Sequence, residues 1–397
     1  MHALPPVSPM ATTGTHPDGR EAVRVIDERI VHRDPHAYCA HPHMTVTAAG
    51  TWLLVFNRTI RRPVVLHPPQ DPEFRNVLMR STDEGRTWSA PMVVPGYGFS
   101  GIECAGLTAL ADGRVLLNQW RFGWVPLGDA ERSDAPADLV RPERLMAGLI
   151  GSTELAGFSG RATAAELAAA FPWARGPGET FVHVSDDDGR SFRIGEPIAT
   201  APYSGGYGMR GALELSDGTL VLPLSDVPRY EAIFVVRSAD RGRTWSAPIP
   251  VAAGAGHEFE EPAGLVLDDG RLLLMLRDNA TRILHATTSD DGGLSWSPAA
   301  PTGIATYPAD LLRLADGRAV CVTGRREPPF GIVLHVSPDG GRTWPADRPV
   351  TVRDDLPDHD LGYPTVAERA DGSLVVVYYG RDADGVTAIH QTTVRLD

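Results

Sequence analysis

The apolar positions of this 397-residue chain fall into short alternating runs that recur along its length. In each recurrence an alternating apolar segment leads into a glycine turn and then into a strongly apolar strand. Measured at the turn glycines, the period is roughly 50 residues, within the range of propeller repeats. The six segments span residues 41–58, 105–121, 211–226, 262–277, 308–325 and 364–380.

A second pattern, Ser-x-Asp-x-Gly-x-(Ser/Thr)-(Trp/Phe), recurs after five of these segments. Its Asp carboxylate can accept hydrogen bonds from the N–H groups of its own turn, its glycine permits a positive φ, and its aromatic ring anchors the turn. Each copy therefore predicts a hairpin turn. The copies occupy residues 81–88, 185–192, 238–245, 289–296 and 337–344.

Six units of about four short strands predict an all-β, six-bladed β-propeller. The last unit has apolar strands at 374–379 and 386–394 but no copy of the turn motif. Residues 21–31 alternate like a strand and belong to no unit, so we expect this strand to complete the last blade and remove an exposed edge. The propeller then spans residues 21–397, and we expect residues 1–20 to be a disordered tail.

One interval between turn glycines is about double the others. The excess, at about residues 122–180, is rich in Gly, Pro and charge and contains an Ala-rich run at 162–171 with helical propensity. We expect a partly helical insertion in blade 2. Three roles are left open for this insertion: a surface elaboration, a lid over the site, or a contact between copies of the chain in a homo-oligomer.

Composition narrows the function classes. A hydrophobic content of 42% supplies a core, and a formal net charge of −13 argues against a nucleic acid or an anionic membrane as partner. No apolar run is long enough to span a bilayer, and residues 1–20 lack the pattern of a secretion signal. Cys39, Cys104 and Cys321 are odd in number and far apart, which fits a reducing compartment. We expect a cytoplasmic protein.

Chemistry in a propeller is expected where the inner strands converge on the axis. Several segments end in arginine, and a ring of guanidinium groups facing the axis would bind a carboxylate, such as that of an acidic sugar. The alternative is that these arginines pair with neighbouring carboxylates and tie blades together. They are Arg58, Arg121, Arg277, Arg325 and the adjacent Arg326. Acidic and aromatic residues stand at the strand starts: Glu103, Tyr207, Glu260, Glu261, Tyr307, Asp310, Asp360 and Tyr363.

The turn motif resembles the Asp-box of the sialidase (neuraminidase) superfamily, and its five copies cover most of residues 40–397. This resemblance implies the propeller fold more strongly than the activity, because Asp-boxes lie on outer turns and also occur in non-hydrolytic propellers. Residues 261–277 look like the blade-4 string of the family, which begins with a functional Glu and ends with a substrate-binding Arg. Residues 208–223 are similar to the preceding blade.

The resemblance implies a retaining, exo-acting glycosidase with Tyr363 as nucleophile and Glu261 as its base. Neighbouring arginines are expected to lower the pKa of the tyrosine. Asp71, in the blade-1 loop, is the candidate general acid; the alternative is that it is an ordinary loop residue before Pro72. Glu260 is the alternative to Glu261 as the base, because a shift of one residue in the strand exchanges the faces on which the two side chains lie. The substrate-binding candidates are Arg277 with Arg325 or Arg326, together with Arg58, Arg121, Arg210 and Tyr307.

Blade 1 departs from the family pattern. Sialidases have Arg-Ile-Pro there, whereas this chain has Ala40-His41-Pro42-His43, so the first arginine of the carboxylate-binding triad is missing, and Arg58 or Arg121 is left to substitute. In an extended strand His41 and His43 would project to one face. A neutral histidine there can take a proton near pH 7. With no Cys or Glu partner close by, we expect no metal at these histidines.

Two other functions remain open for a carbohydrate-directed propeller that needs no cofactor. A polysaccharide lyase would neutralise a uronate with Arg277 and remove a proton with His41, His43 or Tyr363. The third hypothesis is a non-catalytic carbohydrate-binding propeller. The presence of Glu261, Arg277 and Tyr363 together argues against it.

Overall fold

The structure is a computed structural model of the chain. It describes residues 23–62, 66–95, 101–132, 134–135, 139–145, 172–227 and 229–396. The expected tail at 1–20 and the Ala-rich run at 162–171 lie outside the described residues.

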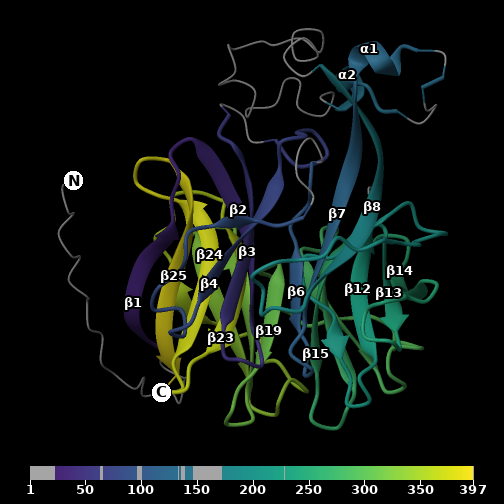
Figure 1. Cartoon of the computed structure of the whole chain (residues 1–397). Helices are drawn as coiled ribbons and strands as arrows, with labels where there is room; N and C mark the ends of the chain where they lie inside the picture. The colour runs from purple at the N-terminus through teal and green to yellow at the C-terminus, as the bar shows by residue number, and fades with distance from the viewer. Residues whose placement is uncertain are drawn as a thin grey trace.

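Six antiparallel sheets stand around a common axis and form a six-bladed β-propeller, as predicted (Figure 1). Blade 1 contains β2 (Ala37–Val46), β3 (Trp52–Ile60), β4 (Arg75–Ser81) and β5 (Met92–Val93). Blade 2 contains β6 (Gly106–Ala109), β7 (Val115–Pro126), β8 (Trp173–Ser185) and β9 (Pro197–Ile198). Blade 3 contains β10 (Gly206–Tyr207), β11 (Leu213–Glu214), β12 (Leu220–Asp226), β13 (Ala232–Ser238) and β14 (Ile249–Ala253).

The remaining blades repeat the same hairpin order. Blade 4 contains β15 (Phe259–Val266), β16 (Leu272–Asp278), β17 (Ile283–Ser289) and β18 (Ala300–Pro301). Blade 5 contains β19 (Ala309–Arg313), β20 (Ala319–Arg325), β21 (Gly331–Ser337) and β22 (Val350–Arg353). Blade 6 contains β23 (Gly362–Glu368), β24 (Leu374–Arg381) and β25 (Thr387–Leu396), with β1 (Val23–His32) at its outer edge.

The two ends of the described chain close the ring. Strand β1 pairs antiparallel with β25, with Val23 opposite Leu396, and Figure 1 shows the purple first strand against the yellow last strand. The indole N–H of Trp88, in the blade-1 turn motif, donates to Gln391 of β25 at 3.0 Å. This closure is the one predicted from the unpaired alternating segment near the N-terminus.

The blade-2 insertion is, in its described part, an extension of one hairpin. Strands β7 and β8 stay paired from Val115 opposite Ser185 to Pro126 opposite Trp173. They rise well beyond the other blades and carry the short helices α1 (Leu127–Ala130) and α2 (Pro142–Leu145) at the tip (Figure 1). None of the described helices has the length and apolar character needed to span a bilayer.

The core lies between neighbouring blades because strands β3, β12, β16, β20 and β24 are apolar on both faces. Leu53 and Val55 of β3, for example, pack in one cluster with Leu107 and Leu117 of blade 2. Glycine is required where two blades approach most closely: a Cβ on Gly106 would lie 2.1 Å from the carbonyl oxygen of Arg210.

The turn motifs are structural, as their chemistry predicts. In the first copy, the Asp83 carboxylate accepts from the Thr87 N–H at 2.8 Å, the Thr87 hydroxyl at 2.6 Å and the Ser81 hydroxyl at 2.7 Å. Gly85 has a φ of 72°, which L side chains rarely adopt. The same bonds recur at Asp187, Asp240, Asp291 and Asp339.

These motifs predict acid sensitivity. Hydrogen bonds from the hydroxyl and the N–H of Thr244 lower the pKa of Asp240 to about 2, below the unfolded value of about 3.9. A depressed carboxyl pKa stabilises the fold above the unfolded pKa, and this stabilisation is lost as the pH falls toward the folded pKa. The contribution of these motifs to the free energy of unfolding, measured by urea titration, should therefore be constant near neutral pH and fall between about pH 4 and 2.

The D240N variant should lose part of that pH dependence, whereas D347N, at a side chain that is 82% exposed, should keep it. Identical pH profiles for D240N and the wild type would contradict the assignment of the acid sensitivity to the turn motifs.

Candidate active site

In three inner strands, the same kind of β-bulge directs a side chain toward the axis. Each has a register shift in which one residue with a positive φ is followed by proline. A β-bulge of this kind re-aims a side chain, and a non-glycine residue held at positive φ is strained, so such positions cluster at functional sites. The three residues are His41 (φ 55°) in β2, Glu261 (φ 52°) in β15 and Tyr363 (φ 44°) in β23.

Tyr363, Glu261 and Arg277 form a hydrogen-bonded chain. The Tyr363 hydroxyl donates to Glu261 Oε1, and Glu261 Oε2 accepts from Arg277 Nη1 at 2.7 Å. Arg277 Nε donates to Asn279 Oδ1 at 2.8 Å and lies 3.2 Å from Glu260 Oε1. Of the two rival glutamates, Glu261 is therefore the one in contact with the tyrosine.

Burial raises the pKa of Tyr363 well above its ordinary value, and the charge of Glu261 raises it further. Arg277 and Arg326 act in the opposite direction without overcoming these effects. The two arginines lower the tyrosine pKa, as expected, but desolvation outweighs them and the net shift is upward. Tyr363 is a neutral phenol that needs an adjacent base to become a nucleophile.

Two arginines flank the tyrosine. The Arg326 guanidinium lies 5.5 Å from the centre of the Tyr363 ring, and its Nε has no hydrogen-bond partner among the residues that the structure describes. The Arg277 guanidinium lies 4.8 Å from the ring centre of Tyr307, within cation–π range. Arg325 instead donates its Nε to the carbonyl oxygen of Pro329, so Arg326 is the member of that pair beside Tyr363.

The expected ring of arginines does not form. Arg58 pairs with Asp34, with 2.5 Å between Nη2 and Oδ2, and Arg121 stacks on Phe181 at 4.1 Å from the ring centre. Arg58 is held by the loop before β2, and Arg121 by the adjoining strand β8. The alternative weighed for these arginines, a structural pairing, describes them better.

Arg210 is also structural. It lies between β10 and β11, where the inner strand of blade 3 is interrupted, and it is only 4% exposed. Its Nε donates to the carbonyl oxygen of Ala309 at 3.0 Å, its Nη2 to that of Pro364 at 2.9 Å and its Nη1 to that of Pro42 at 3.3 Å. One guanidinium thus joins blade 3 to blades 5, 6 and 1. These contacts support a structural role for Arg210 and not substrate binding.

The two blade-1 histidines have separate surroundings. The His41 ring meets Tyr363 edge to face, with centroids 4.3 Å apart, whereas His43 Nδ1 accepts from the Leu107 N–H of blade 2 at 2.9 Å. The bulge between them breaks the simple alternation from which we expected one shared face. Burial lowers the pKa of both imidazoles to about 3, so both are neutral at pH 7.

The Asp71 carboxylate is paired with the half-buried Arg62. The carboxylate receives Arg62 Nε at 2.8 Å and Nη2 at 3.2 Å, and it also accepts from the Glu73 N–H at 3.0 Å and the Thr59 hydroxyl at 3.2 Å. The side chain is fully buried. A carboxylate held by four hydrogen bonds, two of them from a guanidinium, is poorly suited to donate a proton, so this geometry does not support the acid role.

Glu103, which precedes the blade-2 inner strand β6, is a second candidate for the acid. Burial and the charges of Glu261 and Glu260 raise its pKa to about 8, with Arg175 opposing them. Burial and the charge of Glu261 also raise the pKa of Glu260. Glu103 is therefore a protonated carboxylic acid at neutral pH, close enough to Glu261 to interact electrostatically with it.

The sequence matches one protein family over residues 170–376, that of the BNR repeat-like domain. The chain belongs to this family. No curated protein matches the sequence significantly.

Solved structures resemble this BNR repeat-like protein along nearly its whole length but at low identity. A protein of unknown function from Dyadobacter fermentans is 21% identical, with a TM-score of 0.75, over 95% of this chain and all of the other. A mutant NanB sialidase from Streptococcus pneumoniae is 14% identical, with a TM-score of 0.67, over 93% of this chain and 71% of the other. An α-L-arabinanase from Penicillium chrysogenum is 14% identical, with a TM-score of 0.58, over 93% and 98%. These likenesses establish the fold.

Sequence reasoning on this BNR repeat-like chain placed Glu103 among the residues at strand starts but gave it no role. Its signal is weak, because what distinguishes it is burial near two other carboxylates from a different blade. The repeated Xaa-Pro steps at His41, Glu261 and Tyr363 were a stronger signal, since they mark the three bulges in the sequence itself.

Proposed function

We propose that the protein is a retaining exo-glycosidase acting on a carboxylate-bearing sugar, with Tyr363 as nucleophile and Glu261 as its base. The observation that carries this proposal is the chain from the Tyr363 hydroxyl through the Glu261 carboxylate to Arg277. A carbohydrate-binding protein has no need of a tyrosine whose hydroxyl donates to a buried, arginine-held carboxylate. The neighbouring folds include glycosidases of two kinds, which agrees with hydrolysis but does not choose the sugar.

The first half-reaction uses the neutral phenol. As Tyr363 Oη bonds to the anomeric carbon, its proton passes to Glu261, and the bond from that carbon to the leaving oxygen breaks. A neutral nucleophile avoids the repulsion that a carboxylate would meet beside a negatively charged sugar. Arg277 holds the Glu261 carboxylate in place, which keeps its other oxygen directed at the hydroxyl.

Glu103 is our candidate for the general acid, in place of Asp71. Protonated at neutral pH, it gives its proton to the leaving oxygen. In the second half-reaction the resulting carboxylate takes a proton from water as that water attacks the anomeric carbon. Tyr363 then leaves and recovers its proton from Glu261, which restores the starting state.

Arg326 is our candidate for binding the sugar carboxylate. It is the described arginine beside Tyr363 whose Nε has no partner, and a guanidinium with free donors suits a carboxylate. Arg277 adds positive charge from the other side of Glu261. No arginine stands at position 40, where the family resemblance would place the first of three, so the sugar need not be sialic acid.

The acid assignment predicts a specific pH profile. Because Glu103 must be protonated, kcat/KM should fall as the pH rises above about 8. In E103Q this alkaline limb should vanish, and the rate on a substrate with a poor leaving group should drop by about 10²–10⁴, with a smaller loss on an activated aryl glycoside. The exposed Glu179 provides the control, E179Q. An unchanged limb in E103Q would exclude Glu103 as the acid.

The direct test is to supply the protein with a fluorogenic sialoside and, separately, with uronic acid oligosaccharides, while following fluorescence and near-ultraviolet absorbance. Fluorophore release, or a new reducing sugar without absorbance, supports the hydrolase. Rising absorbance on a uronate reveals an unsaturated product and supports a lyase. If neither signal appears with either class of substrate, the proposed activity on acidic sugars is contradicted.

One observation keeps the lyase as a second candidate. The imidazole of His41 is neutral and lies against the Tyr363 ring, so a base and a phenol stand together beside Arg326. Removal of a proton next to a neutralised carboxylate needs that combination. His43 does not take part in it, because its Nδ1 is bonded to the Leu107 N–H.

A further inference from the structure

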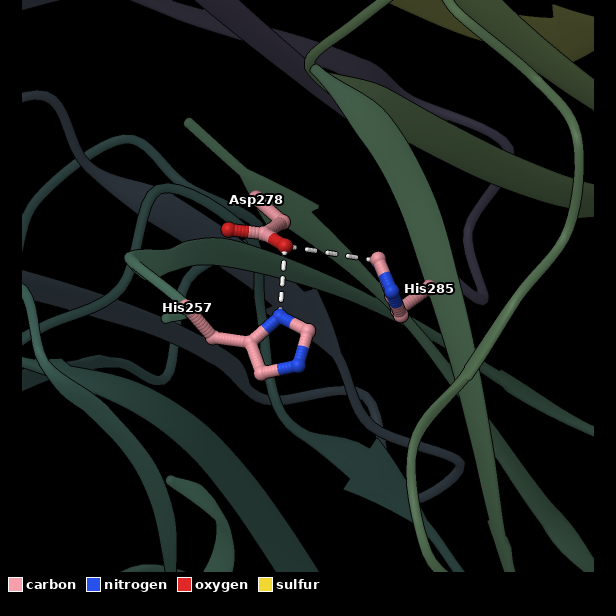
Figure 2. Close-up of side chains that lie close together, drawn as sticks. All are labelled: His257, Asp278 and His285. Carbon is pink, nitrogen blue, oxygen red and sulfur yellow. Dashed lines mark hydrogen bonds and ion pairs between the residues drawn. The ribbon is translucent and has the colours of Figure 1, made fainter. Parts of the chain in front are cut away.

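Blade 4 holds a second group of ionisable side chains that the proposed mechanism does not use. His257 precedes β15, Asp278 ends β16 and His285 lies in β17. Figure 2 shows both imidazole rings beside the Asp278 carboxylate. His257 Nδ1 lies 2.7 Å from Asp278 Oδ2, and His285 Nδ1 lies 3.8 Å from the same oxygen. One ligand atom from each residue falls within 4.8 Å of the other two.

The carboxylate is held rigidly in this position. Asp278 Oδ1 accepts from the N–H groups of Glu258 at 2.9 Å and Ala280 at 3.1 Å. The Asp278 side chain is fully buried. These two bonds leave Oδ2 as the oxygen that faces the histidines, with the rotatable hydroxyl of Thr281 at 2.8 Å as its other partner. Backbone donors that orient a carboxylate in this way are typical outer-shell partners of a metal ligand.

The position of His285 beside the carboxylate does not depend on a hydrogen bond to it. His285 Nδ1 is too far from Asp278 Oδ2 for a hydrogen bond and instead bonds the carbonyl oxygen of Ile283, two residues earlier in β17, at 3.1 Å. The ring is buried and stands edge to face with His257, at a centroid distance of 5.2 Å. The His257 side chain is 36% exposed, which opens one side of the group to solvent.

We propose that His257, Asp278 and His285 bind a first-row divalent transition metal ion, for which Zn²⁺ is the best match. Two imidazole nitrogens and one carboxylate oxygen form a donor set that zinc prefers, and the solvent-facing side leaves room for water as a fourth ligand. Donors bound at about 2.0–2.2 Å to one ion lie within about 4 Å of each other, so the three side chains need only a small contraction.

Binding exchanges some interactions for others. The hydrogen bonds from His257 Nδ1 to Asp278 Oδ2 and from His285 Nδ1 to the Ile283 carbonyl oxygen are replaced by metal bonds, and the proton of His257 moves from Nδ1 to Nε2. His285 binds through Nδ1 with its proton on Nε2. We expected no metal in this chain and weighed one only at the histidines of blade 1; His257 and His285 were not considered, because a whole hairpin separates them in the sequence.

The location suggests a structural role. Asp278 lies between Arg277, which binds Glu261, and Asn279, which binds Arg277. An ion at Asp278 would link the start of β15 to the β16–β17 hairpin and stiffen the segment that carries both residues. The test does not use activity, so its result is independent of the proposed glycosidase function.

The experiment is a calorimetric titration of chelator-treated full-length protein with Zn²⁺. We expect one ion per chain, and at least a tenfold weaker affinity in H257A and H285N. H36A, at an exposed histidine outside the group, is the matched control and should bind as the wild type does. Mg²⁺ and Ca²⁺ should not compete, because they prefer all-oxygen sites.

Thermal unfolding separates binding from folding defects. Compared with the same protein in chelator, Zn²⁺ should raise the Tm of the wild type and of H36A but not that of H257A. Absence of zinc binding by the wild type, or undiminished binding by a folded H257A, would overturn the proposal and leave the group as a hydrogen-bonded turn.

Discussion

Replacing Tyr363 by phenylalanine is expected to lower kcat/KM by about 10²–10⁴ on whichever substrate the wild type cleaves. The substitution removes the hydroxyl that donates to Glu261 and keeps the ring that packs against His41 and Arg326. Because the ring stays, KM should change less than kcat. Steady-state kinetics with the fluorogenic sialoside, or with the substrate that replaces it, provides the measurement.

Tyr378 is the matched control for this experiment. It is buried in the same blade, in β24, and its hydroxyl bonds Thr392 and Arg353. Y378F should retain nearly all activity. The double variant Y363F/E261Q should be little worse than either single variant, because the two groups act as one unit. Wild-type turnover in both Y363F and E261Q would refute the tyrosine mechanism.

Replacing Arg210 by methionine is expected to lower the free energy of unfolding by about 3–5 kcal/mol. The guanidinium donates to three carbonyl oxygens, and its Nε lies 3.7 Å from Asp310 Oδ1. Methionine fills much of the same volume but leaves those carbonyls without their donor and the buried carboxylate without its counter-charge. Urea unfolding at pH 7 measures the difference.

Arg58 is the matched control, since it was an equal candidate for substrate binding. Its pair with Asp34 is about one-third exposed, and R58M should cost only about 0–1 kcal/mol. An R210M variant that unfolds within about 1 kcal/mol of the wild type would contradict the axial role. The variant should also lose activity without direct contact to substrate, because Arg210 binds the carbonyl oxygens of the prolines that follow His41 and Tyr363.

The predictions for Tyr363 and Arg210 concern the same part of the fold, the hydrogen-bonded inner strands around the axis. Arg210 and Asp310 hold the bulged inner strands together, and the bulges present Tyr363, Glu261 and His41. Strained backbone persists only where its surroundings over-determine it. The axial hydrogen bonds are part of those surroundings, so stability and catalysis should be linked at this point in the fold.

The fold could be predicted from the sequence because the patterns that specify it involve residues close together in the chain. The spacing of the turn glycines, the five Asp motifs and the unpaired strand near the N-terminus each depend on residues close together in the chain. A turn carboxylate such as that of Asp83 finds its donors within four residues, so the sequence specifies the contact directly. The family, the six blades and the closure by β1 all follow from such patterns.

The candidate site was readable only in part. The pairing of Tyr363 with Glu261 was inferred from resemblance, and the structure brings the two together. The destinations of the other charged side chains were not readable, because each depends on a partner supplied by a distant segment. Arg210 meets carbonyl oxygens from three blades, and His43 meets an N–H of blade 2.

The sequence by itself determined the repeat, the all-β class and the strand starts that reach the axis, because hydrophobic period and turn chemistry act over a few residues. Only the tertiary structure decided which of those residues meet. Burial beside Glu260 and Glu261 makes Glu103 an acid with a pKa of about 8, while Arg62 engages Asp71. Desolvation and charge pairing depend on three-dimensional proximity, and a propeller creates that proximity by closing a ring.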